Sequence, residues 1–232
     1  MTKPVCAILG VGPGNGMACA RRFSEGGYAL GLCSRRGPDA AALASVSDAH
    51  GYACDVTDPA SLDAALAAIR ADLGPIETLV FNAGSAHWGD IDALDADALR
   101  RDVEVNAVGL FLAAKGVLPG MRELGRGNIV VIGAGAALRG RPGTIAFAAG
   151  KAAQRSVAQS LARQLGPENI HVAYLVLDGV VDLATTKARM PDKPETFFLS
   201  AEGVAEAAFA VTRQDRQAWS FELDLRPFGE SW

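Results

Sequence analysis

A glycine-rich stretch near the start of the chain has the residue types that bind phosphate. Residues 10–16 read GVGPGNG and lie between an apolar run, 5–11, and a helical pattern over 16–26. Glycines allow a tight turn there and let backbone N–H groups approach a pyrophosphate at the positive end of a helix. A turn that needs glycine only for its conformation is the alternative, but a position in the first strand–helix unit favours a dinucleotide site. The predicted contacts are Gly10, Gly14, Asn15 and Gly16.

Two arginines follow the second apolar run of the chain. An acid about twenty residues after such a glycine loop binds the adenosine ribose and selects NAD. This chain has Ser34, Arg35 and Arg36 there instead. A guanidinium holds the extra phosphate of NADP through charge-assisted hydrogen bonds, whereas a carboxylate repels it. The sequence therefore predicts NADP(H) in preference to NAD(H), with two solvated arginines before a turn as the alternative.

Strand and helix patterns alternate along the whole chain around these residues. Such alternation predicts a parallel, doubly wound α/β sheet of about seven strands with helices on both faces. We predict one Rossmann-type domain over residues 1–232. Strands are expected at 5–11, 28–33, 51–54, 76–81, 127–132, 170–177 and 219–223, and helices at 16–26, 39–46, 58–72, 97–117, 144–165 and 201–211.

Composition excludes several classes of protein. Of the 232 residues, 50% are hydrophobic and 21% charged, with a net charge of -4, which excludes a disordered chain and argues against a nucleic-acid partner. The four cysteines lack a CxxC spacing, so no metal site is implied. The opening segment has neither a secretory signal pattern nor the length of a membrane span. We expect a cytoplasmic protein with reduced, interior cysteines that acts on a small molecule.

Further motifs follow in a fixed order. Asn-Ala-Gly at 82–84 ends the fourth apolar run, and Asn106 and Lys151 lie in the two long helical segments. With the glycines at 10, 14 and 16, they make the chain resemble the short-chain dehydrogenase/reductase family over essentially its whole length, although Leu9 replaces the family's usual threonine. The resemblance implies adenine contacts at Asp55 and Val56, cofactor contacts at Asn82, Ala83, Gly84, Gly179 and Val181, a proton relay at Asn106, and binding of the nicotinamide ribose by Lys151.

Two positions depart from the pattern of that family. Its catalytic tyrosine stands four residues before the lysine, where this chain has Phe147, and its catalytic serine stands after the fifth strand, where this chain has Ala134. Neither side chain has a proton to donate. Because a positioned general acid is worth about 10²–10⁴ in rate, either another group protonates the substrate or the reaction is different.

Several side chains are candidates for the missing role. His87, three residues after the Asn-Ala-Gly motif, is the first candidate acid, since histidine titrates near neutral pH, and a surface-loop histidine is the alternative. Lys151 could polarise an oxygen directly. Asp178 would act as an acid only with a pKa raised by burial, and capping is the alternative. Arg139 and Arg141 could clamp an anionic or phenolic substrate, or belong to a solvated turn.

Three functions stay open from the sequence. We favour an NADPH-dependent reductase of a bulky apolar or aromatic carbonyl compound, because Trp88 and Phe147 indicate an aromatic pocket. The second is a tailoring enzyme, an oxygenase or isomerase acting on an activated aromatic or polyketide-like substrate. The third is a catalytically silent NADP-binding sensor or scaffold. The resemblance also implies a homodimer or homotetramer formed through the helices at 97–117 and 144–165.

Overall fold

One seven-stranded parallel sheet forms the centre of the molecule. The computed structural model describes residues 3–229, apart from the side chains of residues 40 and 41. The strand order β3-β2-β1-β4-β5-β6-β9 reverses direction between β1 and β4, and this is the point where a doubly wound sheet opens a crevice at the carboxyl ends of its strands. The strands are β1 (Val5–Leu9), β2 (Ala29–Ser34), β3 (Ala49–Ala53), β4 (Ile76–Phe81), β5 (Gly127–Ile132), β6 (Ile170–Leu177) and β9 (Glu222–Leu225).

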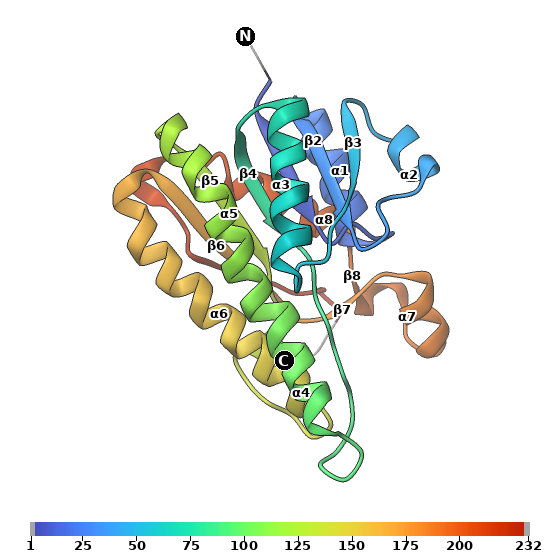
Figure 1. Cartoon of the computed structure of the whole chain (residues 1–232). Coiled ribbons are helices and arrows are strands. Elements are labelled where there is room, and N and C mark those ends of the chain that lie inside the picture. The colour runs from blue at the N-terminus through green and yellow to red at the C-terminus, as the bar shows by residue number, and fades with distance from the viewer. Residues whose placement is uncertain (1–2, 230–232) are drawn as a thin grey trace.

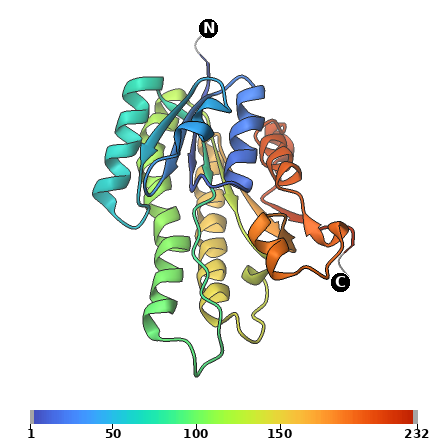
Figure 2. The ribbon, with the colours of Figure 1, turned by 90° about the vertical axis from the view of Figure 1, so that its right-hand side faces the viewer.

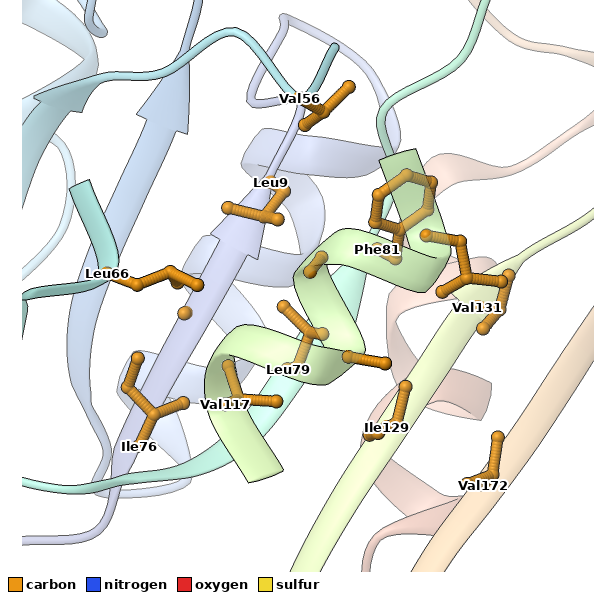
Figure 3. Close-up of a cluster of buried hydrophobic side chains, with 14 of the residues drawn as sticks. Leu9, Val56, Leu66, Ile76, Leu79, Phe81, Val117, Ile129, Val131 and Val172 are labelled. Atoms are coloured by element: carbon orange, nitrogen blue, oxygen red, sulfur yellow. The ribbon is translucent and has the colours of Figure 1, made fainter. Parts of the chain in front are cut away.

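Helices cover both faces of this sheet (Figures 1 and 2). On one face lie α3 (Pro59–Leu73), α5 (Gly109–Leu124) and α6 (Ile145–Leu165), and on the other lie α1 (Asn15–Glu25) and α8 (Ala201–Val211). Successive side chains of a strand enter opposite layers: Leu9 packs beneath α5, as Figure 3 shows, whereas Ile8 packs against α1 and α8. Burial on both faces explains why the strands appear as continuous apolar runs in the sequence.

The first long helical segment extends beyond its predicted end. It consists of α4 (Ala96–Val103), a π-helical turn (Glu104–Val108) and α5, and it ends where Gly125 adopts a left-handed φ of +64°. Helix 97–117 was therefore too short, because Pro119 lies inside α5 instead of ending it. Among the described residues, one helix, Ala96–Leu124, has the length and the apolar composition to cross a membrane. Its residues Leu110 and Val117 are buried against the sheet, however, as in the core helix of a globular domain.

Some boundaries near the sheet edges also differ from the prediction. The last strand starts at Glu222 instead of residue 219, because Trp219 stacks on His171 with ring centroids 4.7 Å apart and the carbonyl of Ser220 accepts a hydrogen bond from His171. These contacts hold residues 219 and 220 outside the ladder. The strand β3 starts at Ala49, two residues before its predicted start at residue 51. The helix α2 (Ala40–Ala44) is shorter than the predicted helix over 39–46.

The segment between β6 and α8 has structure that the sequence patterns did not predict. It contains helix α7 (Ala184–Arg189) and a separate two-stranded sheet of β7 (Val180–Val181) and β8 (Phe198–Leu199). Thr186 Oγ1 donates to the carbonyl of Val181 at 2.6 Å and ties α7 to β7. These elements lie at the same end of the sheet as the loop after β4 (Figures 1 and 2).

Candidate active site

The glycine loop is held against the end of β4. The Asn82 amide donates to the carbonyl of Gly10 at 2.6 Å, and the N–H groups of Gly10 and Val11 donate to the carbonyl of Cys33, both at 2.9 Å. Gly10 has φ +91°, in the left-handed region that favours glycine. The predicted loop residues therefore meet Asn82 and β2 at the crevice between β1 and β4.

This loop lines a groove whose polar groups fit a dinucleotide phosphate. The groove has a volume of about 240 Å³ and is lined by Gly14, Asn15, Gly16, Asn82 and Val181, among others. Among the described residues, no side chain caps the start of α1. Uncapped N–H groups at a helix N-terminus bind anions, so the residues present fit the phosphates of such a cofactor.

The two glycines at 10 and 12 give a matched test of this loop. We expect Gly10→Ala to lower the free energy of unfolding by about 2–5 kcal/mol, because its Cβ would collide with the backbone of Ala83 in a left-handed conformation. Gly12→Ala is the control, since a Cβ there meets no atom within 4 Å. Urea unfolding of both variants measures the difference. Equal losses would contradict the close approach of Gly10 to β4.

The residues predicted at the adenosine end lie next to one another. Ser34 ends β2 beside Ala53 of β3, and Arg35 and Arg36 follow as exposed side chains. The Asp55 carboxylate accepts hydrogen bonds from the N–H and Oγ1 of Thr57 at 3.0 and 2.8 Å. These bonds, together with the nearby Arg35 charge, lower the pKa of Asp55. The next residue, Val56, is buried.

A second, larger cavity of about 440 Å³ brings together residues from the loop after β4, the end of β5, α6 and the segment after β6. Its wall is mainly apolar, and Trp88 packs on Phe147 with ring centroids 4.9 Å apart. The loop that carries Trp88 is fixed by a hydrogen bond from Gly89 to the carbonyl of Gly143 at 3.0 Å. The predicted cofactor and catalytic residues that line this cavity are Asn15, Asn82, Ala134, Phe147, Lys151, Gly179 and Val181, and the further candidates Trp88, Arg139, Arg141 and Asp178 line it as well.

Lys151 is the buried cation of this cavity. Its ammonium donates to the carbonyl of Ile132 at 3.1 Å and to Oε1 of Gln154 at 3.0 Å, and both acceptors are neutral. Burial lowers the pKa of Lys151 to about 8, and the charge of Asp102 opposes that change. Gln154 was not predicted, although its spacing of three residues from Lys151 on a helix places the two side chains on one face.

Asn106 occupies the π-helical turn behind Lys151. Its amide donates to the carbonyls of Ser85 and Asp102 at 2.9 and 2.8 Å, and its buried Oδ1 has no partner among the described residues. A Cβ placed on Gly84 would lie 3.4 Å from that Oδ1 atom and 3.9 Å from the Lys151 ammonium. Asn106, Gly84 and Lys151 are therefore neighbours, as the motif order implies, and π-helical turns occur frequently at functional sites.

His87 faces a buried carboxylate and is not one of the residues that line the cavity. Its Nδ1 lies 2.7 Å from Oδ1 of Asp102, and its backbone N–H donates to Oδ2 of the same carboxylate at 2.8 Å. Asp102 is fully buried on α4 and was not predicted, although it precedes Asn106 by one helical turn. The pair holds the loop after β4 against α4.

Asp178 forms an ion-pair cluster instead of capping a helix. Its carboxylate accepts two hydrogen bonds from Arg139, at 2.7 and 2.6 Å, and also pairs with Arg226. The expected capping role was therefore wrong, because the carboxylate meets side chains from two distant segments. Of the two arginines considered for a clamp, Arg139 is engaged by Asp178, and Arg141 lines the same cavity. Within residues 3–229, no group of three His, Cys, Asp or Glu side chains is placed to hold a metal ion.

Comparison with known proteins identifies the family of this site. Residues 4–194 match the family described as short chain dehydrogenase. The chain belongs to the short-chain dehydrogenase family. The chain is 37% identical over 205 residues to a Xanthobacter autotrophicus protein named inactive 2-(S)-hydroxypropyl-CoM dehydrogenase 2, covering 82% of this chain and 89% of that protein.

Solved structures of other proteins agree with the fold. A short-chain dehydrogenase from Rhodopseudomonas palustris superposes with a TM-score of 0.83 at 29% identity, covering 97% of this chain and 99% of the other. An alcohol dehydrogenase from Thermococcus sibiricus, solved in complex with 5-hydroxy-NADP, has a TM-score of 0.83 at 22% identity, covering 99% and 98% of the two chains. The predicted fold class is confirmed.

Proposed function

We propose that this short-chain dehydrogenase is an NADP(H)-dependent reductase of a bulky apolar or aromatic carbonyl compound, with Lys151 in place of the family's tyrosine as proton donor. The observation that carries the proposal is the buried Lys151 ammonium in the wall of an apolar cavity next to the glycine-loop groove. NADPH, when bound, would supply a hydride to the carbonyl carbon. The protein must then stabilise and protonate the carbonyl oxygen.

Lys151 has the surroundings that this role requires. Its two partners are neutral, so no carboxylate bonded to the ammonium competes with a substrate oxygen for its charge. A pKa lowered by burial to about 8 leaves the group protonated near neutral pH and able to release the proton. His87 has less support as the donor, because it lies outside the cavity lining.

The NADP(H) preference is supported by two cations at the adenosine end. Arg35 and Arg36 make no hydrogen bond or ion pair to another residue in the described part of the chain, so their guanidinium groups are open to a phosphate. The Thermococcus sibiricus relative, solved with 5-hydroxy-NADP, supports the same cofactor class.

We expect Arg35→Glu to weaken NADPH binding by roughly 10- to 100-fold, since a charge-assisted hydrogen bond is worth about 1.5–3 kcal/mol. NADH affinity should change far less, because that cofactor lacks the extra phosphate. Fluorescence titration with NADPH and NADH measures the ratio of the two affinities. The matched control is Arg213→Glu, at an exposed position after α8. A parallel loss of both affinities would contradict the proposed phosphate contact.

The reductase proposal is tested by substrate-dependent oxidation of NADPH. The purified protein is incubated with NADPH and a panel of aromatic ketones and quinones, and both cofactor consumption and alcohol product are measured. Stoichiometric formation of alcohol supports the proposal. Turnover without cofactor consumption would instead identify the tailoring-enzyme class.

A second function has an observation of its own in its favour. The cavity contains Phe147 and Ala134 where the family's tyrosine and serine stand, and the Xanthobacter autotrophicus relative is named as inactive. We infer from this that a catalytically silent NADP-binding sensor or scaffold is the runner-up. Tight NADPH binding with no turnover on any carbonyl in the panel would favour it over the reductase.

We also propose a homodimer or homotetramer formed through α5 and α6. Phe111 of α5 is 51% exposed, which is unusual for a large apolar side chain and suits a symmetric contact. A cytoplasmic location is proposed because all four cysteines are free and buried, as in reducing compartments. Light scattering measures the oligomeric state.

A further inference from the structure

We propose that the substrate carries a carboxylate, which Arg141 binds at the wall of the 440 Å³ cavity, so that the ligand class is an aromatic or apolar keto acid. The carbonyl half of this inference rests on the proposed reductase function. The carboxylate half rests on the charges of the cavity alone.

Four charged side chains line the cavity, and two of them satisfy each other. They are Arg139, Arg141, Lys151 and Asp178. The Asp178 carboxylate accepts hydrogen bonds from Arg139 at 2.7 and 2.6 Å and also pairs with Arg226, which comes from outside the lining. The negative charge of the wall is therefore engaged by the ion-pair cluster. Arg141 and Lys151 supply the positive charge that is left.

Among the described residues the Arg141 side chain has no hydrogen-bond or ion-pair partner, although its backbone is fixed. Its N–H donates to Oγ1 of Thr144 at 2.9 Å, and its carbonyl accepts from the same hydroxyl at 2.8 Å and from the Thr144 N–H at 3.1 Å. The guanidinium makes no hydrogen bond or ion pair with another residue between 3 and 229. The Arg141 guanidinium, held beside the cavity by this anchored backbone, can therefore bind an anionic group of a ligand.

The remaining wall indicates what the ligand must otherwise contain. The aromatic pair of Trp88 and Phe147, with Ile132 and Leu177, gives a surface that suits a ring or a branched hydrocarbon. A planar guanidinium binds a carboxylate through two parallel hydrogen bonds. Arg141 is exposed, so this contact would lie on the solvent side of the cavity while the apolar part of the ligand fills the interior. A neutral ligand of the same shape would leave the Arg141 charge without a partner.

A pair of shape-matched probes tests the carboxylate contact without any turnover. 3-Phenylpropanoate and its primary amide are titrated calorimetrically into the full-length protein. We expect the acid to bind about tenfold more tightly than the amide, as one charge-assisted contact implies. In the Arg141→Gln variant the affinity for the acid should fall to that for the amide, while the affinity for the amide should stay at its wild-type value. Arg213→Gln, which removes an exposed arginine away from the cavity, should retain the preference.

Three outcomes would overturn the inference. The first is no preference for the acid in the wild type, and the second is no binding of the acid at all. The third is a preference that survives in Arg141→Gln, which would assign the anion to Lys151 or to the glycine loop. Circular dichroism spectra of Arg141→Gln and Arg213→Gln are compared with that of the wild type to check that both variants are folded. Failure of the reductase proposal is separate, because it is measured by NADPH consumption and not by this affinity ratio.

Discussion

We expect Lys151→Met to lower kcat for carbonyl reduction by about 10²–10⁴, the usual contribution of a positioned proton donor. Methionine is similar in length and suits a buried position, but it carries neither charge nor proton. The substitution removes the Lys151 hydrogen bond to the Ile132 carbonyl and leaves Gln154 Oε1 with only the Tyr174 hydroxyl, at 3.4 Å, as donor, at a cost in stability of about 1–3 kcal/mol. Steady-state kinetics and urea unfolding measure the two effects separately.

The pH dependence gives an independent test of the same residue. Because burial lowers the pKa of Lys151 to about 8, the ammonium loses its proton as the pH rises through that value. A reaction that needs the protonated form must therefore slow above pH 8 in the wild type. Lys3→Met, at an exposed position before β1, is the matched control and should keep both the rate and the pH profile. A variant at 151 that changed only KM would show that the lysine binds cofactor without donating the proton.

The second large effect is expected from restoring the missing hydroxyls. We expect the double variant Phe147→Tyr, Ala134→Ser to raise kcat by less than the about 10²–10⁴ that a first positioned acid contributes, because Lys151 already donates a proton in the wild type and the hydroxyls add a better placed donor. Phe147 lies one helical turn before Lys151, and both side chains line the cavity. Ala134 has an extended backbone, φ -156° and ψ 154°, which serine adopts without strain.

A neighbouring position controls for a general increase in polarity. Phe147→Tyr combined with Ala136→Ser adds the same two hydroxyls to the cavity lining, but one of them at a different place. We expect a clearly smaller gain from this pair, measured by the initial rate of NADPH consumption. Equal rates for the wild type and the double variant at 134 and 147 would mean that the frame performs other chemistry or none.

The fold and the order of the site residues could be predicted from the sequence because both depend on local patterns. Apolar runs of strand length alternate with helical spacing, and every strand of the main sheet was placed, with errors at the ends such as residues 219–221. Motif residues at the carboxyl ends of parallel strands meet at one edge of the sheet. For this reason Asn82, Ala134 and Lys151 line one cavity although they are far apart in the sequence.

The partners of these residues were decided by tertiary packing alone. Asp178 meets Arg139 and Arg226, and His87 meets Asp102, only because loops from different crossovers fold back over the same end of the sheet. Their spacing along the chain carries no signal, since side-chain pairs in contact across a fold follow no period. The same holds for charge: the pKa of Lys151 depends on burial, which is a property of the assembled core and not of the motif. The sequence by itself determined which side chains reach the site, and the tertiary structure decided which of them are neutralised there and which keep a charge for a substrate.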